Sequence, residues 1–231
     1  RNKDLLEDFW KACLKLGRLP ANDEYAQIET LKENVGSPKK AMSIIAGPDR
    51  EEGLKKAGQR RIDDLIVFFA LNLFERRKSF ATMPAKIQRD IKAFFGNYQT
   101  AVGKAKTVLF LAGKADEMAK ACQVALDNGI GYLEQGRSLT LVSKLADRLP
   151  PLLRIYMGCA AQLTGEIDEA DMIKIHIASA KLTLTSYDDF ENKRVPLMLE
   201  RIKIDMRNQS VDFFEYGDQY QPHPVYFKSR Y

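Results

Sequence analysis

The stretch RRIDDLIVFFALNLF, residues 60–74, decides the class of fold that this sequence predicts. It is long enough for about four turns of α-helix, and its apolar residues cover nearly every face. Such a helix is typical of a protein interior, because each of these side chains left in water would cost about 1.5–3 kcal/mol. The stretch is too short to span a membrane. We therefore expect a central buried helix, with Phe68, Phe69 and Leu71 inaccessible to solvent and basic residues at both ends.

Three shorter helices are expected before this stretch. Residues 4–16 carry apolar residues at helical spacing and are followed by Gly17, and a second helix is expected over residues 23–34. Ser37 and Pro38 are typical of an N-cap and a first helical residue, so a third helix should begin there. This order predicts a tri-helical, helix-turn-helix-like segment over residues 1–50, whose third helix would read DNA. The alternative is a generic packing unit of three helices.

Helical patterns continue after the central stretch. Residue spacing predicts helices over residues 84–96, 98–112, 116–128, 138–148 and 151–163, which makes residues 51–165 a helical core. The glycine-rich residues 128–136 are expected to form a loop. They lack the glycine spacing of a dinucleotide-binding turn and the lysine of a phosphate-binding loop, and no strand is predicted before them.

From about residue 173 the apolar residues recur at every second position. The segments IKIHIAS, KLTLTSY, LERIKIDMR, SVDFFEY and VYFKS alternate apolar and polar residues and are rich in β-branched and aromatic side chains. We expect a small, mostly antiparallel sheet within residues 166–231, an α/β to β C-terminal portion packed on the helical core. The expected fold class is therefore mainly α (a helical bundle with an N-terminal helix-turn-helix-like unit) with a small β portion, that is, α+β.

Basic residues are concentrated around the central stretch. Residues 51–114 carry 13 lysines and arginines against 6 acidic residues, whereas the whole chain has a net charge of only +5. Concentrated positive charge attracts the phosphate backbone of DNA, although a solvated basic face is the alternative. The candidate DNA-binding residues are Ser37, Lys39, Lys40, Arg60, Arg61, Arg76, Arg77, Lys78, Lys86, Arg89 and Lys92.

The composition excludes several other classes of protein. No segment has the composition of a signal peptide or the length of a membrane span, so we expect a cytoplasmic protein without a membrane partner. The three cysteines lie far apart with no CxxC pair, and only two histidines are present, which argues against a structural metal site. His176 and His223 have no visible serine or cysteine partner that would make a nucleophilic triad.

The strongest catalytic candidates are acidic. Asp188, Asp189, Glu200 and Lys203 lie on or between predicted strands, and Mg²⁺-dependent nucleases gather carboxylates and a lysine on such a hairpin. In those enzymes the last two groups are usually two positions apart, but Glu200 and Lys203 are three apart. On a strand, that spacing sends the two side chains to opposite faces. The alternative is that these charges are solvated residues of turns and strands.

Several stretches resemble the C-terminal region of a bacterial family of methyltransferase-like proteins associated with DNA phosphorothioation. They include LGRLP at 16–20, GSPKKAM at 36–42, RRIDDLIVFFAL at 60–71, PAKIQRDIKAFFGNY at 84–98, LLRIYMGCA at 152–160, ADMIKIH at 170–176, YDDF at 187–190 and LERIKIDMR at 199–207. The resemblance implies that a methyltransferase domain, which binds S-adenosylmethionine through a glycine-rich loop, precedes this region in the full-length protein. Nothing in this chain matches that loop, so no cofactor in this chain and no catalytic residue follow from the resemblance.

The resemblance and the basic surplus together predict a DNA-binding accessory domain of a DNA-modification protein. Its expected partners are double-stranded DNA, including phosphorothioate-modified DNA, and other proteins of the modification system. The alternatives are a catalytic fragment of a DNA-modifying or Mg²⁺-dependent DNA-cleaving enzyme, or a protein–protein scaffold of the same system.

Overall fold

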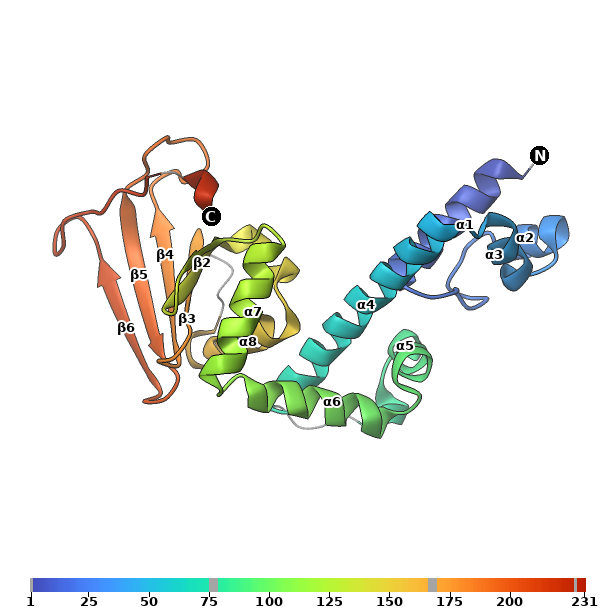
Figure 1. Cartoon of the computed structure of the whole chain (residues 1–231), viewed down its shortest axis with the longest axis horizontal. Helices are drawn as coiled ribbons and strands as arrows, with labels where there is room; N and C mark the ends of the chain where they lie inside the picture. The colour runs from blue at the N-terminus through green and yellow to red at the C-terminus, as the bar shows by residue number, and fades with distance from the viewer. Residues whose placement is uncertain (1, 75–78, 166–169, 227) are drawn as a thin grey trace. The chain divides into compact units, whose positions relative to one another are not determined.

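The computed structural model describes residues 2–74, 79–165, 170–226 and 228–231. The described residues form helices and one antiparallel sheet, so the fold is α+β, as the sequence predicts. The chain divides into two compact units, and each is described by itself. Unit 1 comprises residues 1–66 and 78–101, and unit 2 comprises residues 67–77 and 102–231. Figure 1 labels the main elements of both units.

Unit 1 is helical. Its elements are α1 (Lys3–Leu16), α2 (Ile28–Val35), α3 (Pro38–Ile45), most of α4 (Pro48–Leu71), the short helix η1 (Phe80–Thr82), α5 (Ala85–Phe95) and the start of α6 (Tyr98–Leu111). Phe9, Trp10 and Cys13 of α1 are buried against Leu31 of α2 and other apolar side chains of the first three helices. This small core gives the N-terminal helices a fixed packing.

The turn after α1 lies very close to α4. Gly17 has a φ of 68°, and a Cβ atom at this position would lie 2.8 Å from the carbonyl oxygen of Ala57. Any larger residue would therefore be strained in its backbone and would also collide with α4. The close approach places Arg18, the next residue, beside α4.

The second helix is shorter than the sequence predicts. It begins at Ile28 rather than near Asp23, and the residues before it form turns. The carboxylate of Glu24 accepts hydrogen bonds from the backbone N–H of Ala21 and from the side chain of Arg18. These bonds stabilise the turn, because Glu24 accepts hydrogen bonds from two donors that are not part of a helix.

Unit 2 combines helices with the sheet. After the end of α4 and most of α6 come α7 (Ala115–Asp127), β1 (Tyr132–Glu134), β2 (Ser138–Val142), η2 (Ser143–Arg148), α8 (Pro151–Thr164), β3 (Met172–His176), β4 (Lys181–Tyr187), β5 (Met198–Asp205), β6 (Ser210–Glu215) and η3 (Lys228–Arg230). The six strands lie in the order of the chain, and all neighbours are antiparallel.

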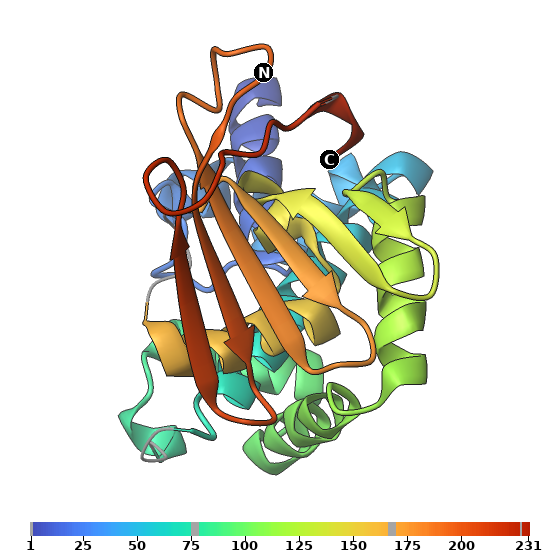
Figure 2. The ribbon, with the colours of Figure 1, turned by 90° about the vertical axis from the view of Figure 1, so that its left-hand side faces the viewer.

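The two faces of the sheet differ in chemistry. Leu141, Ile173, Leu184 and Ile204 point to the inner face and form one buried cluster with residues of α7 and α8. The alternate residues point to the outer face, where one register row joins Thr140, Lys174, Thr183, Lys203 and Asp212 across β2 to β6. Figure 2 looks onto this outer face, and the last residues of the chain cross its upper part. This row is polar, whereas Val142 and Met172 at other outer-face positions pack with Phe190 and Val225 in a small apolar cluster.

Strands begin earlier than the sequence predicts. The prediction of a helix over residues 138–148 is wrong, because this segment forms β2 followed by the short helix η2, and β1 replaces part of the expected loop. The segment SLTLV alternates polar and apolar residues over its first four positions, which favours a strand, although the segment is short. Its state is decided by pairing with β3, where Ser138 lies opposite His176.

The central helix is only partly as predicted. Phe69 is 3% exposed and Leu71 is partly buried, but Phe68 is 40% exposed, so the expected burial of Phe68 is wrong. On a helix of 3.6 residues per turn, position 68 lies on the side opposite to the buried Ile66 and Ala70. Apolar content alone did not show which side would remain open. No helix in the described part of the chain is long and apolar enough to cross a membrane.

Candidate nucleic-acid interface

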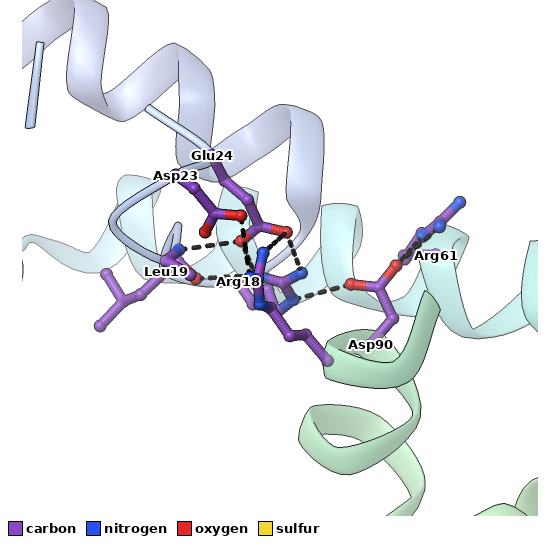
Figure 3. Close-up of polar contacts among 8 residues, drawn as sticks. Arg18, Leu19, Asp23, Glu24, Arg61 and Asp90 are labelled. Carbon is purple, nitrogen blue, oxygen red and sulfur yellow. Dashed lines mark hydrogen bonds and ion pairs between the residues drawn. The ribbon is translucent and has the colours of Figure 1, made fainter. Parts of the chain in front are cut away.

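Asp90 of α5 is the centre of a buried ion-pair network in unit 1. Its side chain is fully buried and accepts hydrogen bonds from two arginines, as Figure 3 shows. The donor–acceptor distances are 2.7 Å from Nε of Arg18, 2.8 Å from Nε of Arg61 and 2.6 Å from Nη2 of Arg61. The network therefore ties the turn after α1 to α4 and α5.

Glu24 extends this network. It accepts two hydrogen bonds from the guanidinium of Arg18, at 2.7 and 2.8 Å. Nη1 of Arg89 also lies 3.3 Å from Oε1 of Glu24. The bond from Arg18 is the main reason why the pKa of Glu24 falls to about 2. Arg89 also donates to Asp23 at 2.9 Å. Three arginines and three carboxylates thus neutralise one another, and the predicted DNA-binding residues Arg61 and Arg89 belong to this network.

The start of α3 is different. Ser37 is the N-cap, as predicted, and its Oγ accepts a hydrogen bond of 3.1 Å from the backbone N–H of Lys40. Such a cap contributes about 1 kcal/mol to helix stability. Ala41 is buried, whereas Lys39 and Lys40 are exposed and the first turn has no acidic residue. The helix therefore packs on one side and presents two lysines at its positive end.

The other predicted DNA-binding residues are spread over α4 and α5. Arg60, Lys86 and Lys92 are exposed, and Lys92 lines a shallow pocket with Phe80 and Tyr98. Arg76, Arg77 and Lys78 lie outside the described residues. Of the predicted set, the structure thus brings together Ser37, Lys39 and Lys40 at one helix end.

The acidic catalytic candidates stabilise a loop. Asp188 accepts hydrogen bonds from Nζ of Lys193 at 2.7 Å and from the backbone N–H of Leu197 at 2.6 Å, and these bonds lower its pKa. Asp189 accepts a bond of 2.7 Å from the side chain of Asn192. Both residues therefore hold the connection between β4 and β5.

Glu200 and Lys203 lie on opposite faces of β5, as their spacing predicts. Glu200 is opposite Glu215 of β6, whereas Lys203 lies on the outer face with its Nζ 4.8 Å from the ring centroid of Phe214. In the described residues, no group of three or more histidine, cysteine or acidic side chains is arranged to hold a metal ion. Glu200 and Lys203 therefore do not lie together on one face of β5.

The histidines and the buried cysteines have structural surroundings. Nε2 of His176 lies 3.0 Å from Oγ1 of Thr183, and the ring of His223 packs against Tyr216 at 5.6 Å. Burial raises the pKa of Cys13 to about 12 and that of Cys122 to about 11. At neutral pH these two thiols are protonated, which makes them poor nucleophiles.

One site residue that the sequence reasoning missed is Arg201 of β5. Its guanidinium carbon lies 4.9 Å from the ring centroid of Phe214 and 5.4 Å from that of Tyr216. Its Nε is buried and has no hydrogen-bond partner among the described residues. The alternation in ERIKID places Arg201 and Lys203 on one face. The aromatic neighbours come from β6, so only the register of the sheet identifies them.

Unit 1 exposes Lys39 and Lys40, unit 2 exposes Lys203 and Tyr220, and the acidic candidates Asp188 and Asp189 accept hydrogen bonds within a loop. A cationic side chain can form an ion pair with a phosphate group, and an aromatic ring can stack on a nucleic-acid base. Comparisons of the chain with protein-family models, with curated proteins and with solved structures found no match.

Proposed function

We propose that this chain binds double-stranded DNA through unit 1, with the start of α3 as its contact to a phosphate group. The observation that carries the proposal is the exposed pair Lys39 and Lys40 at a helix N-terminus whose first turn has no acidic residue. The arginines of the buried network are neutralised by carboxylates, so they contribute little field outside the protein. In contrast, α3 contains no acidic residue that could neutralise Lys39 and Lys40.

The physics of a helix end supports this role. The N-terminus of a helix carries a positive partial charge of about half an elementary charge, together with backbone N–H groups that lack helical partners. Ser37 uses one of these groups, that of Lys40. Pro38 has no N–H, so a phosphate oxygen can accept bonds from the backbone N–H of Lys39 and from the two lysine side chains. The exposed Arg60, Lys86 and Lys92 add positive potential to the same unit.

Contacts of this kind give affinity rather than sequence choice. A lysine on a phosphate positions the duplex but does not read a base edge. Each phosphate neutralised should contribute about −0.9 to the slope of log affinity against log salt. The proposed role is therefore that of an accessory region, which holds DNA for chemistry performed by other parts of a modification system. That system is the one that the resemblance to phosphorothioation-associated proteins indicates.

The test is a titration of a fluorescein-labelled duplex, followed by anisotropy at several salt concentrations. The double variant Lys39→Glu/Lys40→Glu should bind weakly and show a flatter salt slope, by about 2 in the exponent if each lysine neutralises one phosphate. The matched control is Lys11→Glu/Lys15→Glu, which makes the same charge change on exposed positions of α1. Equal loss in both variants would remove the role of α3, and absence of binding by the unaltered protein at low salt would remove DNA as a ligand of unit 1.

A second arm tests the context in which the protein works. The same duplex is prepared with one phosphorothioate linkage, and the two affinities are compared. Preference for the modified duplex would support a role after sulfur insertion. Equal affinity would support a general contact with the backbone.

A further inference from the structure

Arg201 of unit 2 is a half-buried cation that has no acidic partner within the described part of the chain. Among the described residues, no carboxylate forms an ion pair with it, and its buried Nε makes no hydrogen bond. Buried polar groups are satisfied in most proteins, and an unpartnered group costs about 1–3 kcal/mol. The rings of Phe214 and Tyr216 contact the guanidinium through their faces, and neither residue accepts a hydrogen bond from the Nε. The Nε itself is closed to solvent, so a ligand can meet only the part of the half-buried guanidinium that remains accessible.

A second cation lies beside it on the same face. Lys203 is two positions further along β5, is exposed, and approaches the ring of Phe214 to 4.8 Å. The field of this face also acts on His176, whose pKa is lowered first by burial and then by Lys174, Lys181 and Lys203. Positive potential thus extends over the middle of the outer face.

Most acidic groups on the outer face are already engaged. Glu134 pairs with Lys174, and Asp205 pairs with Lys181 while it also accepts bonds from the turn after β5. Asp212 lies opposite Lys203 in the register and is exposed. Arg201 has Thr185 and Phe214 in the corresponding positions, so the register gives it no acidic neighbour.

Tyr220 presents an accessible ring next to these cations. It is 46% exposed, and its ring centroid lies 5.8 Å from that of Phe214 and 5.8 Å from that of Tyr216. The turn that carries it is closed by a 2.8 Å hydrogen bond from the backbone N–H of Gly217 to the carbonyl of Tyr220. We name Arg201, Lys203, Phe214, Tyr216 and Tyr220 the Arg201 cluster.

We propose that the Arg201 cluster binds a single strand of nucleic acid, with a phosphate on Arg201 and Lys203 and a base stacked on Tyr220. An arginine held by aromatic rings keeps its planar donors oriented for phosphate oxygens. Aromatic rings beside cations are typical of surfaces that bind unpaired bases, because every base has a π-face. A duplex keeps its base faces stacked inside the helix, so only an unpaired strand can use Tyr220.

This inference goes beyond the proposed function of unit 1, because both the surface and the form of the ligand differ. The probe is a fluorescein-labelled oligodeoxythymidine of about 12 nucleotides, within the usual site size of such surfaces. Arg201→Gln and Tyr220→Ala should each weaken binding about tenfold, the loss expected for one stacked base or one phosphate contact. Arg207→Gln is the matched control, since Arg207 is an exposed arginine of the turn between β5 and β6 and should change affinity less than about twofold.

Three results would overturn the inference. The first is that the unaltered protein does not bind the oligonucleotide at low salt. The second is that the Arg201→Gln and Arg207→Gln variants have equal affinity, and the third is that polyglutamate displaces the oligonucleotide as readily as unlabelled oligonucleotide of equal charge does. If Arg201→Gln does not fold, as judged by circular dichroism, Lys203→Gln takes its place because Lys203 is exposed.

The result for the cluster is independent of the duplex experiment. Lys39→Glu/Lys40→Glu should leave single-strand affinity unchanged, whereas Arg201→Gln should leave duplex affinity unchanged. Loss of one activity without the other then identifies which proposal has failed.

Discussion

Arg18 in unit 1 and Arg201 in unit 2 are both largely withdrawn from solvent, but their partners differ. Arg18 donates to the carboxylates of Asp90 and Glu24 at 2.7 Å each. Arg201 lies between two aromatic rings, and its Nε has no acceptor among the described residues. One arginine is therefore neutralised by carboxylates, and the other has no acidic partner among the described residues.

The difference teaches how burial should be interpreted for a charged side chain. Removing one residue of a buried ion pair strongly destabilises the native state, because the charge of the remaining residue is left buried without a partner. A cation on aromatic rings is held less strongly, by about 0.5–2 kcal/mol, and keeps its hydrogen-bond donors. The predictions below test this contrast, from the largest expected effect to the smallest.

Asp90→Ala should have the largest effect. It would leave both Arg18 and Arg61 without their shared buried acceptor, at an expected loss of about 3–5 kcal/mol in the free energy of unfolding. Trp10 is the only tryptophan and lies in the core of unit 1, so urea unfolding followed by its fluorescence reports on this unit. Glu33→Ala, at an exposed position of α2, is the control and should change little. A small loss in Asp90→Ala would mean that the network is not structural.

The stability of unit 1 should fall in acid because of Glu24. The pKa of this carboxyl lies at about 2 in the folded protein against an ordinary 4.5, chiefly because Arg18 donates to it. The stabilisation is therefore complete above pH 4.5 and is lost as the pH falls towards 2, by an amount on the order of 2 kcal/mol. The measurement is the urea midpoint of Trp10 fluorescence between pH 7 and pH 2.5. Glu24→Gln should start less stable and lose less over this range, and parallel curves would contradict the assignment.

Arg89→Gln should have a smaller effect than either change. Its side chain is 34% exposed, and its partner Asp23 is 65% exposed, so water competes for both groups. Exposed ion pairs contribute about 0–1 kcal/mol. The same fluorescence titration, repeated at high salt, should show that this small difference disappears. A loss as large as that of Asp90→Ala would place Arg89 inside the essential network.

Arg201→Gln should have the smallest effect on stability, within about 0.5 kcal/mol of the unaltered protein. It removes the contacts with the two rings but also takes an unpartnered Nε out of a buried position, so the two effects should largely cancel. Thermal unfolding followed by circular dichroism, which reports on the helices and the sheet together, is the measurement. Arg18→Gln, measured in the same way, is the comparison. Equal losses in the two variants would show that Arg201 is structural, and the contrast between the arginines would fail.

Much of the helical fold could be predicted because its signals are local. Ser37 and Pro38 mark the start of α3 within a single turn, and Gly17 marks the end of α1. The alternation over β4, β5 and β6 likewise lies within each strand. These patterns depend on residues fewer than about five positions apart, which the sequence displays directly.

The sequence by itself determined the α+β class, the cap of α3 and the face of β5 that carries Arg201 and Lys203. Only the tertiary structure decided that residues 138–142 form a strand, that Phe68 remains open while Phe69 is buried, and which arginines have carboxylate partners. Arg18 and Asp90 are 72 positions apart, and Arg61 and Asp90 are 29 apart. Pairings of this kind exist only after the helices have packed and the strands have taken their register, because no local pattern specifies which distant charge a side chain will meet.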